Sequence, residues 1–250
     1  MIKRALGGSL LTTALFAAGC ARAGLPFVTD DPEPVKLHAW EINTGWSMQR
    51  SGDVRSGAAP GVDINYGAFT NVQLHAQPQL AWVHDKHGST IGVGDLELGV
   101  KYRITPPDAP PEALMVGIYP MLQLPTGNAD KGLGAGAHSL YLPLWLQTSR
   151  DAWTVYGGAG YRIDSGVGAQ NAWAGGVTVL RAVSERLQVG AELFGSTTRQ
   201  LGERGTLGFN LGAIYDLDHG MALLLSAGRG VGANRDSNQA SAYLGVRVSL

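Results

Sequence analysis

The chain has few of the features that mark several common protein classes. Its 250 residues contain one cysteine, Cys20, so no internal disulfide can form. Only 16% of the residues are charged, the net charge is −1, and the lysines and arginines are scattered, which argues against nucleic acid as a partner. The longest apolar run, from Ala5 to Ala18, is shorter than the roughly 20 residues with which a helix crosses a bilayer. These absences argue against a disulfide-stapled domain, a nucleic-acid-binding protein and a helical membrane protein.

Enzymatic motifs are also absent. The sequence has no GxSxG, HExxH or Walker-type motif, and the glycine-rich GLGAG lies in a predicted loop with no helix after it. A lipid-modifying barrel enzyme would need a histidine close to a serine, and His75, His138 and Ser139 are the available residues, but nothing in their spacing indicates that they meet. Three further polar residues, typical of a solvated hairpin rather than a metal site, are His84, Asp85 and His87. We therefore predict no enzyme, no cofactor and no metal.

Glycine, by contrast, is abundant at 36 residues, and apolar and polar residues alternate from Leu37 to Leu250. The final segment, ASAYLGVRVSL, places Leu244, Val246 and Val248 on one face and Tyr243 and Arg247 on the other. Side chains of a strand alternate between faces, so one face can meet lipid while the other meets water. The pattern predicts an all-β fold, a single antiparallel transmembrane β-barrel of about 12 strands. A soluble β-sandwich, which gives the same alternation, is the alternative.

The predicted strands have lengths that suit a tilted membrane crossing of roughly 9–11 residues. They cover residues 37–48, 61–68, 72–83, 93–104, 113–124, 139–148, 152–163, 171–181, 186–196, 206–216, 220–228 and 239–250. Long polar connections such as QRSGDVRSGAA, HDKHGST, TGNADKGLGAGAH and GRGVGANRDSN alternate with mostly short ones. This asymmetry is typical of an outer-membrane barrel with both termini in the periplasm. Three prolines inside strands, each expected to mark a bulge, are Pro78, Pro120 and Pro143.

The chain begins with an export signal. Lys3 and Arg4 precede the first apolar run, and Ala21 and Ala23 supply the small residues of a cleavage site. We predict a signal peptide over residues 1–23, a periplasmic N-terminal segment over 24–36 that can plug the lumen, and the barrel over 37–250. Cleavage before Cys20, which would make the protein a lipoprotein, is the alternative.

The residues on the polar face of each predicted strand are expected to form the wall of the lumen. Strands two to four contribute mostly charged and amide side chains, and strands five to seven contribute mostly aromatic ones. The residues predicted to line the lumen are Asp63, His75, Gln77, Glu97, Lys101, Arg103, Tyr119, Tyr141, Trp145, Tyr156, Arg162, Glu192 and Arg247. The lumen is either a conduit for a small, partly apolar solute or simply filled with side chains, because a barrel of about 12 strands lies between packed and open sizes. Glu97, Lys101 and Arg103 can equally form a structural ion network.

Aromatic residues on the apolar faces of the strands predict an aromatic girdle at the membrane surface, formed by Trp40, Trp46, Trp153 and Tyr161. Trp153 and Tyr161 are eight residues apart on one face. That separation corresponds to about 26 Å along a strand, which a tilt of about 40° reduces to roughly 20 Å of depth.

Several segments resemble, in order, one family of Gram-negative outer-membrane proteins. They are PFVTDDPEP followed by HAWEIN, GVDINYG, GVGDLELGVKYRI, YPMLQLPTG, LPLWLQ, WTVYGGAGYRI, GAELFG and GFNLGAIYDL. The family is named for the MetA pathway of phenol degradation, and the resemblance covers nearly all of the chain after the signal. It implies an outer-membrane β-barrel that passes aromatic or other hydrophobic compounds, with no catalytic residues. The chain departs from many such barrels at its last residue, which is Leu250 rather than Phe or Trp.

Together these observations predict an outer-membrane channel or transporter for small hydrophobic or aromatic compounds. The alternatives are a non-conducting structural or surface-binding barrel, whose long loops 126–137 and 229–238 do the work, and, less favoured, a lipid-modifying barrel enzyme. The expected partners are outer-membrane lipid and lipopolysaccharide, the barrel assembly machinery during biogenesis, and a small hydrophobic solute. The sequence does not identify the solute, its direction or the oligomeric state.

Overall fold

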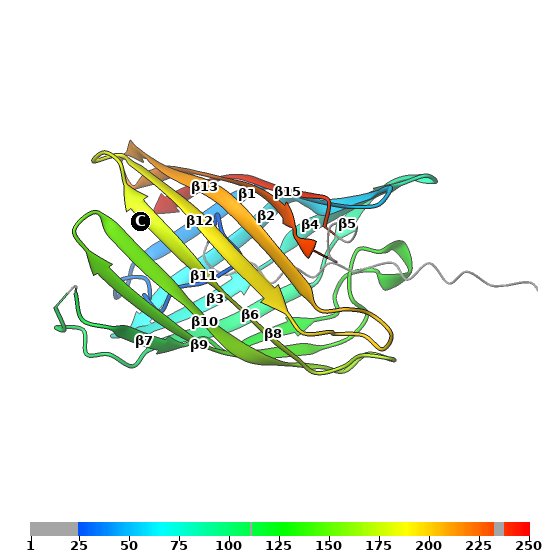
Figure 1. Cartoon of the computed structure of the whole chain (residues 1–250), viewed down its shortest axis with the longest axis horizontal. Helices are drawn as coiled ribbons and strands as arrows, with labels where there is room; N and C mark the ends of the chain where they lie inside the picture. The colour runs from blue at the N-terminus through cyan, green and yellow to red at the C-terminus, as the bar shows by residue number, and fades with distance from the viewer. Residues whose placement is uncertain (1–24, 111, 233–237) are drawn as a thin grey trace, which may run out of the picture.

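A computed structural model shows a closed antiparallel β-barrel (Figure 1). The structure describes residues 25–110, 112–232 and 238–250. The predicted signal peptide, with Cys20 and its alternative cleavage site, lies outside the described residues, as does part of loop 229–238.

Fifteen β segments form the barrel wall. They are β1 (Trp40–Ser51), β2 (Val54–Phe69), β3 (Val72–Gln77), β4 (Gln79–Asp85), β5 (Gly88–Val93), β6 (Leu96–Arg103), β7 (Met115–Ile118), β8 (Met121–Leu124), β9 (Ser139–Arg150), β10 (Trp153–Asp164), β11 (Ala172–Ala182), β12 (Leu187–Ser196), β13 (Thr206–Asp218), β14 (Met221–Gly230) and β15 (Ala240–Ser249). Three strands are each interrupted once, as β3 and β4, β5 and β6, and β7 and β8, so the wall has twelve strands. A single 3₁₀ turn, η1 (Ala129–Lys131), lies in the connection after β8.

The barrel closes because β1 pairs with β15 on one side and with β2 on the other. The twelve strands thus form a closed ring, and the β5 segment, which pairs with β4 alone in the described part of the chain, leaves a sheet edge at its hairpin. The connections at residues 70–71, 104–114, 151–152, 183–186 and 219–220 meet at one end with residues 39 and 250, and we call this the turn end. The connections at 52–53, 86–87, 125–138, 165–171 and 197–205, with residues 231–232 and 238–239, lie at the opposite end, which we call the loop end. The predicted all-β barrel of about 12 strands is confirmed.

Two of the predicted long loops are instead extended hairpins. β1 and β2 stay paired as far as Ser51 and Val54, and β4 and β5 stay paired as far as Asp85 and Gly88. The stretches QRSGDVRSGAA and HDKHGST were therefore wrongly predicted to be loops. The physical reason is that these stretches are mostly polar and glycine-containing, so apolar alternation ends there although backbone pairing continues. In Figure 1 the β4–β5 hairpin extends past the other strands at the loop end.

The prediction of a bulge is confirmed at one of the three strand prolines. Across Pro78 the register changes, because Gln77 pairs with Glu97 while Leu80 pairs with Val93, which leaves one extra residue on the partner side. At Pro120 and Pro143 the register runs on without a shift, so the expected bulges there were wrong. Both prolines lack an N–H, yet their carbonyl groups still accept bonds from Val100 and Tyr119 at 3.1 and 3.3 Å.

Apolar side chains cover the outside of the barrel and polar ones fill much of the inside. Leu98, Leu144 and Leu211 point outward and are exposed in the isolated chain, whereas Asn65 on β2 and Asn210 on β13 are buried. This is the reverse of a soluble fold, in which exposed leucines are few and scattered. None of the helices among the described residues is long and apolar enough to cross a bilayer.

Candidate functional site in the barrel lumen

Residues 25–36, which we call the N-terminal segment, run inside the barrel. Prolines 32 and 34 favour an extended path and remove two backbone donors, so the segment adds no strand to the wall. Its remaining polar groups must then find side-chain partners on the wall. Phe27, Thr29 and Asp30 are each at most 2% exposed, which shows how completely the barrel encloses them.

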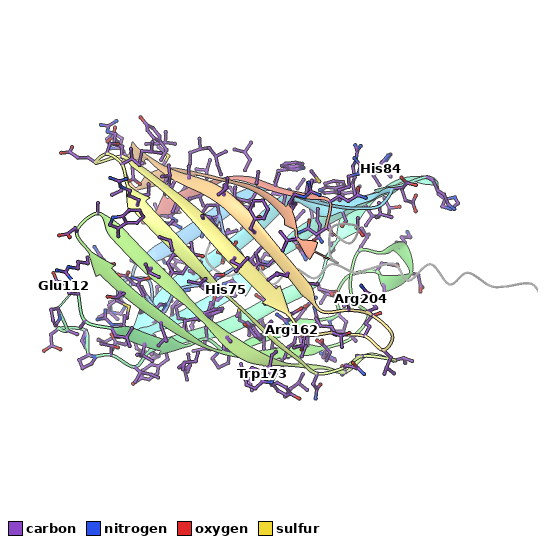
Figure 2. All side chains as sticks on the ribbon, in the orientation of Figure 1. His75, His84, Glu112, Arg162, Trp173 and Arg204 are labelled. Carbon is purple, nitrogen blue, oxygen red and sulfur yellow. The ribbon has the colours of Figure 1, made fainter. Side chains whose placement is uncertain are left out.

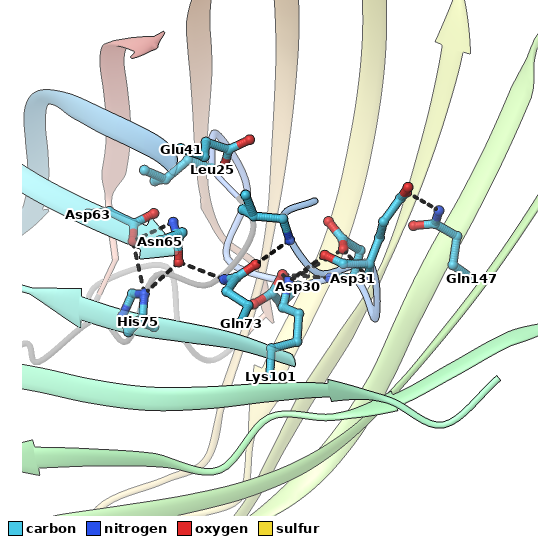
Figure 3. A network of polar contacts seen from close by, with 12 residues as sticks. Leu25, Asp30, Asp31, Glu41, Asp63, Asn65, Gln73, His75, Lys101 and Gln147 are labelled. Carbon is cyan, nitrogen blue, oxygen red and sulfur yellow. Dashed lines mark hydrogen bonds and ion pairs between the residues drawn. The ribbon is translucent and has the colours of Figure 1, made fainter. Parts of the chain in front are cut away.

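Lys101 of β6 is the main cationic anchor of this segment (Figure 3). Its ammonium group donates to the carboxylates of Asp30 at 3.0 Å and Asp31 at 3.4 Å, and to the carbonyl of Glu33 at 3.4 Å. The ammonium also lies 5.0 Å from the ring centre of Tyr119. One buried charge is thus paired with two opposite charges from the segment, which is the usual condition for burying an ion.

A chain of amide and carboxylate groups continues from the segment along the wall (Figure 3). The backbone N–H of Val35 donates to Gln73 at 2.9 Å, and Gln73 donates to Asn65 at 2.6 Å. His75 contacts Asn65 at 3.1 Å and Asp63 at 2.9 Å through Nδ1. Through Nε2 it faces Glu97 at 3.6 Å. These strand residues lie on one face because they occupy alternate positions of β2, β3 and β6.

Glu192 of β12 holds the other end of the segment. Its carboxylate accepts the backbone N–H groups of Val28, at 3.1 Å, and Thr29, and the side-chain amide of Asn210 at 2.8 Å. Two carbonyl groups next to this site are also bonded, that of Pro26 to Ser226 on β14 at 2.6 Å and that of Leu25 to Arg247 on β15 at 3.2 Å. The segment is therefore fixed to strands on several sides of the lumen.

Glycines on the inner wall make room for the segment. Phe27 packs against Tyr156 and Leu180. A Cβ atom added at Gly212 would lie 2.8 Å from the ring of Phe27, and one added at Gly176 would lie 2.2 Å from the hydroxyl of Thr29. Both positions face inward, so the wall is hollowed where the segment lies. Part of the chain's abundance of glycine is explained by this groove.

The Asp30 carboxyl takes up a proton at a higher pH than an exposed aspartate does. Burial raises the pKa of Asp30 to about 6, although Lys101 acts in the opposite direction; the neighbouring Asp31 raises the pKa further. The physical cause is that an ionised carboxylate loses its hydration inside the barrel. Protonation of this residue is therefore coupled to its position in the lumen.

A cavity of about 720 Å³ lies on the loop side of the N-terminal segment. Residues 26–29 border it from below, and the connections 125–138, 165–171 and 197–205 contribute to its rim. Its walls include Tyr141, Trp145, Arg162 and Phe194. A second cavity, of about 70 Å³, is bordered by Asp63 and Gln77 among others. The larger cavity is of the size of a small-molecule site, for which about 300–1,000 Å³ is usual.

With this geometry described, comparison with known proteins identifies the family. A family model described as "Putative MetA-pathway of phenol degradation" matches residues 28–248. The chain belongs to this family. The match runs from the N-terminal segment to the last strand, so it includes the segment inside the lumen as well as the wall. The resemblance of the sequence to the MetA-pathway family is thus confirmed.

Solved structures with the same fold are outer-membrane barrels. An outer-membrane channel of Pseudomonas putida F1 is similar with a TM-score of 0.73 at 15% identity, over 88% of this chain and 98% of that one. The NanC porin is similar with a TM-score of 0.55 at 10% identity, over 84% and 98%. The translocator domain of autotransporter NalP from Neisseria meningitidis has a TM-score of 0.51 at 14% identity, over 84% and 87%. At these identities the likeness concerns the fold. No curated protein matches the chain.

The structure of this MetA-pathway family member places ten of the thirteen predicted lumen residues in buried positions, namely Asp63, His75, Glu97, Lys101, Tyr119, Tyr141, Trp145, Tyr156, Arg162 and Glu192. Gln77, Arg103 and Arg247 are half-buried. Tyr141, Trp145 and Arg162 border the larger cavity, whereas Tyr156 is covered by Phe27. Tyr119 meets His75 edge-on at 5.6 Å, so the polar and the aromatic side chains are in contact there.

The four residues predicted to form an aromatic girdle are all exposed on the outer surface, with Trp40 at 43%, Trp46 at 39%, Trp153 at 47% and Tyr161 at 37%. Tyr161 packs against Trp173, whose ring is 58% exposed and 5.3 Å away. Trp173 was missed by sequence reasoning because its strand, β11, has few other large side chains at that end. Figure 2 shows its side chain on the outside of the barrel.

The candidate enzyme and metal residues do not assemble in the described part of the chain. His75 contacts amide and carboxylate groups rather than a serine hydroxyl, and Ser139 accepts a bond from Arg162 at 3.1 Å. His84 contacts Ser89 at 2.8 Å. No group of three or more His, Cys, Asp or Glu side chains among the described residues is placed to hold a metal ion.

Sequence reasoning also missed Asn43 and the wall glycines. Asn43 is 2% exposed and lies between Asp63, at 3.0 Å, and Arg247, at 3.2 Å. Its inward parity on β1 was visible in the sequence, as it shares a face with Glu41 and Ser47. The glycines carry no side-chain signal, so their role could be recognised only from the position of the segment.

Proposed function

We propose that this protein is an outer-membrane channel for small hydrophobic or aromatic molecules, and that the N-terminal segment is its gate. The proposal is supported by the apolar outer surface, the enclosed polar lumen and the fold shared with outer-membrane channels and porins. The observation that carries it is the cavity of about 720 Å³ bordered by the segment, because it offers space for a solute next to a removable barrier.

The chemistry of the gate favours displacement over permanent closure. The segment joins the wall through charge pairs and hydrogen bonds, including those of Lys101 and Glu192, and contributes no strand pairing. Leaving the lumen would break these contacts without opening the barrel wall. The expected surroundings are lipid and lipopolysaccharide outside and the periplasm at the turn end, with the barrel assembly machinery as a partner during insertion.

A non-conducting barrel is the second candidate, favoured by one observation. Phe27, Thr29 and Asp30 are so deeply enclosed that the lumen is occupied at this level. If the segment never leaves, the exposed hairpins and loops at the loop end carry the function instead, as a surface-binding structure.

Conductance measurements separate the two candidates. The full-length protein and a variant lacking residues 25–36 are inserted into planar bilayers, and uptake of a neutral aromatic solute such as phenol is followed in swelling liposomes. The control variant carries the same twelve residues in scrambled order, so that length and composition are kept. We expect low conductance for the natural chain and higher conductance for both altered chains.

Each outcome bears on one part of the proposal. Equal conductance of all three chains would remove the N-terminal segment as the gate. A barrel that stays sealed to ions and to phenol in every chain would refute the channel and support the non-conducting candidate.

A further inference from the structure

Lys101 and Arg162 are both buried inside the barrel, and they differ in their partners. Lys101 is paired with two carboxylates of the N-terminal segment. Arg162 on β10 is 6% exposed, and no direct ion pair within 4 Å joins its guanidinium to a carboxylate among the described residues, although Glu97 and Asp164 lie near enough to act on its charge. A buried guanidinium with no carboxylate in direct contact is only partly compensated, because distant charges do not replace direct hydrogen-bonded pairing.

The acidic residue closest along the same face of β10 is already occupied. Asp164 accepts two bonds from Arg199, both at 2.8 Å, which forms a bidentate pair. Arg162 itself donates to the hydroxyl of Ser139 at 3.1 Å. A guanidinium has five N–H donors, so this single bond leaves donor capacity for a further acceptor.

Arg162 also stands against the aromatic part of the cavity wall. Its guanidinium carbon lies 4.6 Å from the ring centre of Tyr141, and Tyr141 is fixed in turn by a bond from its hydroxyl to the carbonyl of Ala174 at 2.9 Å. Trp145 meets Tyr141 edge-on with ring centres 6.4 Å apart, and Phe194 borders the same cavity. The guanidinium is therefore held in a fixed orientation beside apolar surfaces.

The position of Arg162 along the barrel suits capture of a molecule from the loop end. It borders the cavity of about 720 Å³, whose rim includes Arg199 and Arg204. Figure 2 shows Arg162 between His75, deeper in the lumen, and Arg204 near the loop end. Arginine rather than lysine at such a site matches the planar, two-oxygen geometry of a carboxylate.

We propose that this cavity is a binding site for a small aromatic carboxylate, whose carboxylate pairs with Arg162 and whose ring contacts Tyr141, Trp145 and Phe194. The inference rests on the proposed channel function, and it makes that function more specific by naming a substrate class. A ligand of this kind would supply a carboxylate in direct contact with Arg162 and would border residues 26–29 of the gate.

Binding to the purified full-length protein in detergent, measured by titration calorimetry, tests the site with three matched probes at pH 7. Benzoate has both the ring and the charge, benzamide has the ring without the charge, and acetate has the charge without the ring. We expect benzoate to bind about tenfold or more tightly than either of the others, because each lacks one of the two contacts. Benzamide binding as tightly as benzoate, or acetate doing so, would overturn the proposal.

Variants then locate the site. Arg162→Gln is expected to weaken benzoate binding about tenfold or more, and Arg162→Lys less, because the charge remains. The matched control is Arg186→Gln, at the turn end, where Arg186 pairs with Asp218 at 3.0 Å on the surface; it should leave binding unchanged. A folded Arg162→Gln barrel, verified by its heat-dependent shift on a gel, that binds benzoate normally would place the ligand elsewhere and refute the proposal.

Failure of this inference can be told apart from failure of the proposed function. Absent benzoate binding in a barrel that still swells liposomes with phenol removes the carboxylate site and leaves the channel. Benzoate binding by a barrel sealed to all solutes keeps the site and removes the channel.

Discussion

Phe27 is the side chain whose removal tests most directly whether the N-terminal segment opens. It is 1% exposed and packs against Tyr156 and Leu180. When the segment leaves the wall, this ring passes from an enclosed apolar site to water. Phe27→Ala therefore weakens the docked state and leaves the charge pairs of Asp30 in place.

The size of the effect follows from the burial. Full burial of a phenylalanine side chain is worth about 2 to 3 kcal/mol relative to its exposed state. At 1.4 kcal/mol for each tenfold change, docking weakens by about 30- to 150-fold. While the open state remains a minority, the fraction of time that the channel is open rises by the same factor.

Single-channel recording in planar bilayers measures this fraction. The matched control is Phe69→Ala, since Phe69 is 70% exposed at the turn end of β2 and therefore gains little burial from the docked segment. An open fraction that stays within about twofold of the natural chain, in a barrel that opens when residues 25–36 are removed, would refute the reasoning that apolar burial holds the gate.

The same gate can be loosened from the wall side. Gly212→Ala places a methyl group 2.8 Å from the ring of Phe27 and 2.7 Å from the backbone carbonyl oxygen of Leu225 on the wall, so in a variant whose barrel still folds it should raise the open fraction without any change in the segment. Gly61→Ala is the control, because its added Cβ would meet nothing closer than 3.3 Å. Equal behaviour of the two variants would contradict the glycine groove.

The remaining predictions concern charge and the membrane. The pKa of Asp30 is about 6 when the segment is docked and 3.8 for an exposed carboxyl, so between about pH 4 and 6 the docked segment binds more protons than the free one. Lowering the pH from 7.5 to 5 should therefore strengthen docking and reduce conductance. Asp30→Asn should abolish this pH dependence. Lys101→Met leaves Asp30 buried without its main counter-ion and should weaken docking by about 3–5 kcal/mol, with part of the loss recovered in the double variant with Asp30→Asn; limited proteolysis of the segment measures both. On the outer face, Leu211→Arg should lower the free energy of folding into a bilayer by about 2–4 kcal/mol, and Leu217→Arg, near the turn end, by at most about 1 kcal/mol, as measured by urea titration. Equal costs at the two positions would contradict the membrane orientation.

The sequence predicts the barrel because strand alternation is a local property. Leu244, Val246 and Arg247 show their faces within a few residues, and so does most of each strand. The hairpins at 49–59 and 84–90 were missed because their sequences are mostly polar, so they show no apolar alternation. Backbone pairing there depends on the partner strand alone.

The site was less predictable because it depends on distant contacts. Lys101 and Asp30 are 71 residues apart in the chain, and only the curvature of the wall brings them together. The alternation of residues along their strands predicts that Lys101 and Arg162 point into the lumen. It does not predict that Lys101 pairs directly with carboxylates of the N-terminal segment whereas Arg162 does not. The groove at Gly176 and Gly212 arises from missing side chains, which no pattern of residue types reveals.

The anchors of the N-terminal segment have a consequence for biogenesis. They come from both early and late parts of the chain, with Gln73 on β3 and Lys101 on β6 at one extreme and Ser226 on β14 and Arg247 on β15 at the other. No intermediate that lacks the final hairpin offers all of them. The N-terminal segment therefore makes its full set of contacts only after β1 and β15 have paired. In a barrel whose assembly has stopped before that step, we expect the segment to be more accessible to proteases.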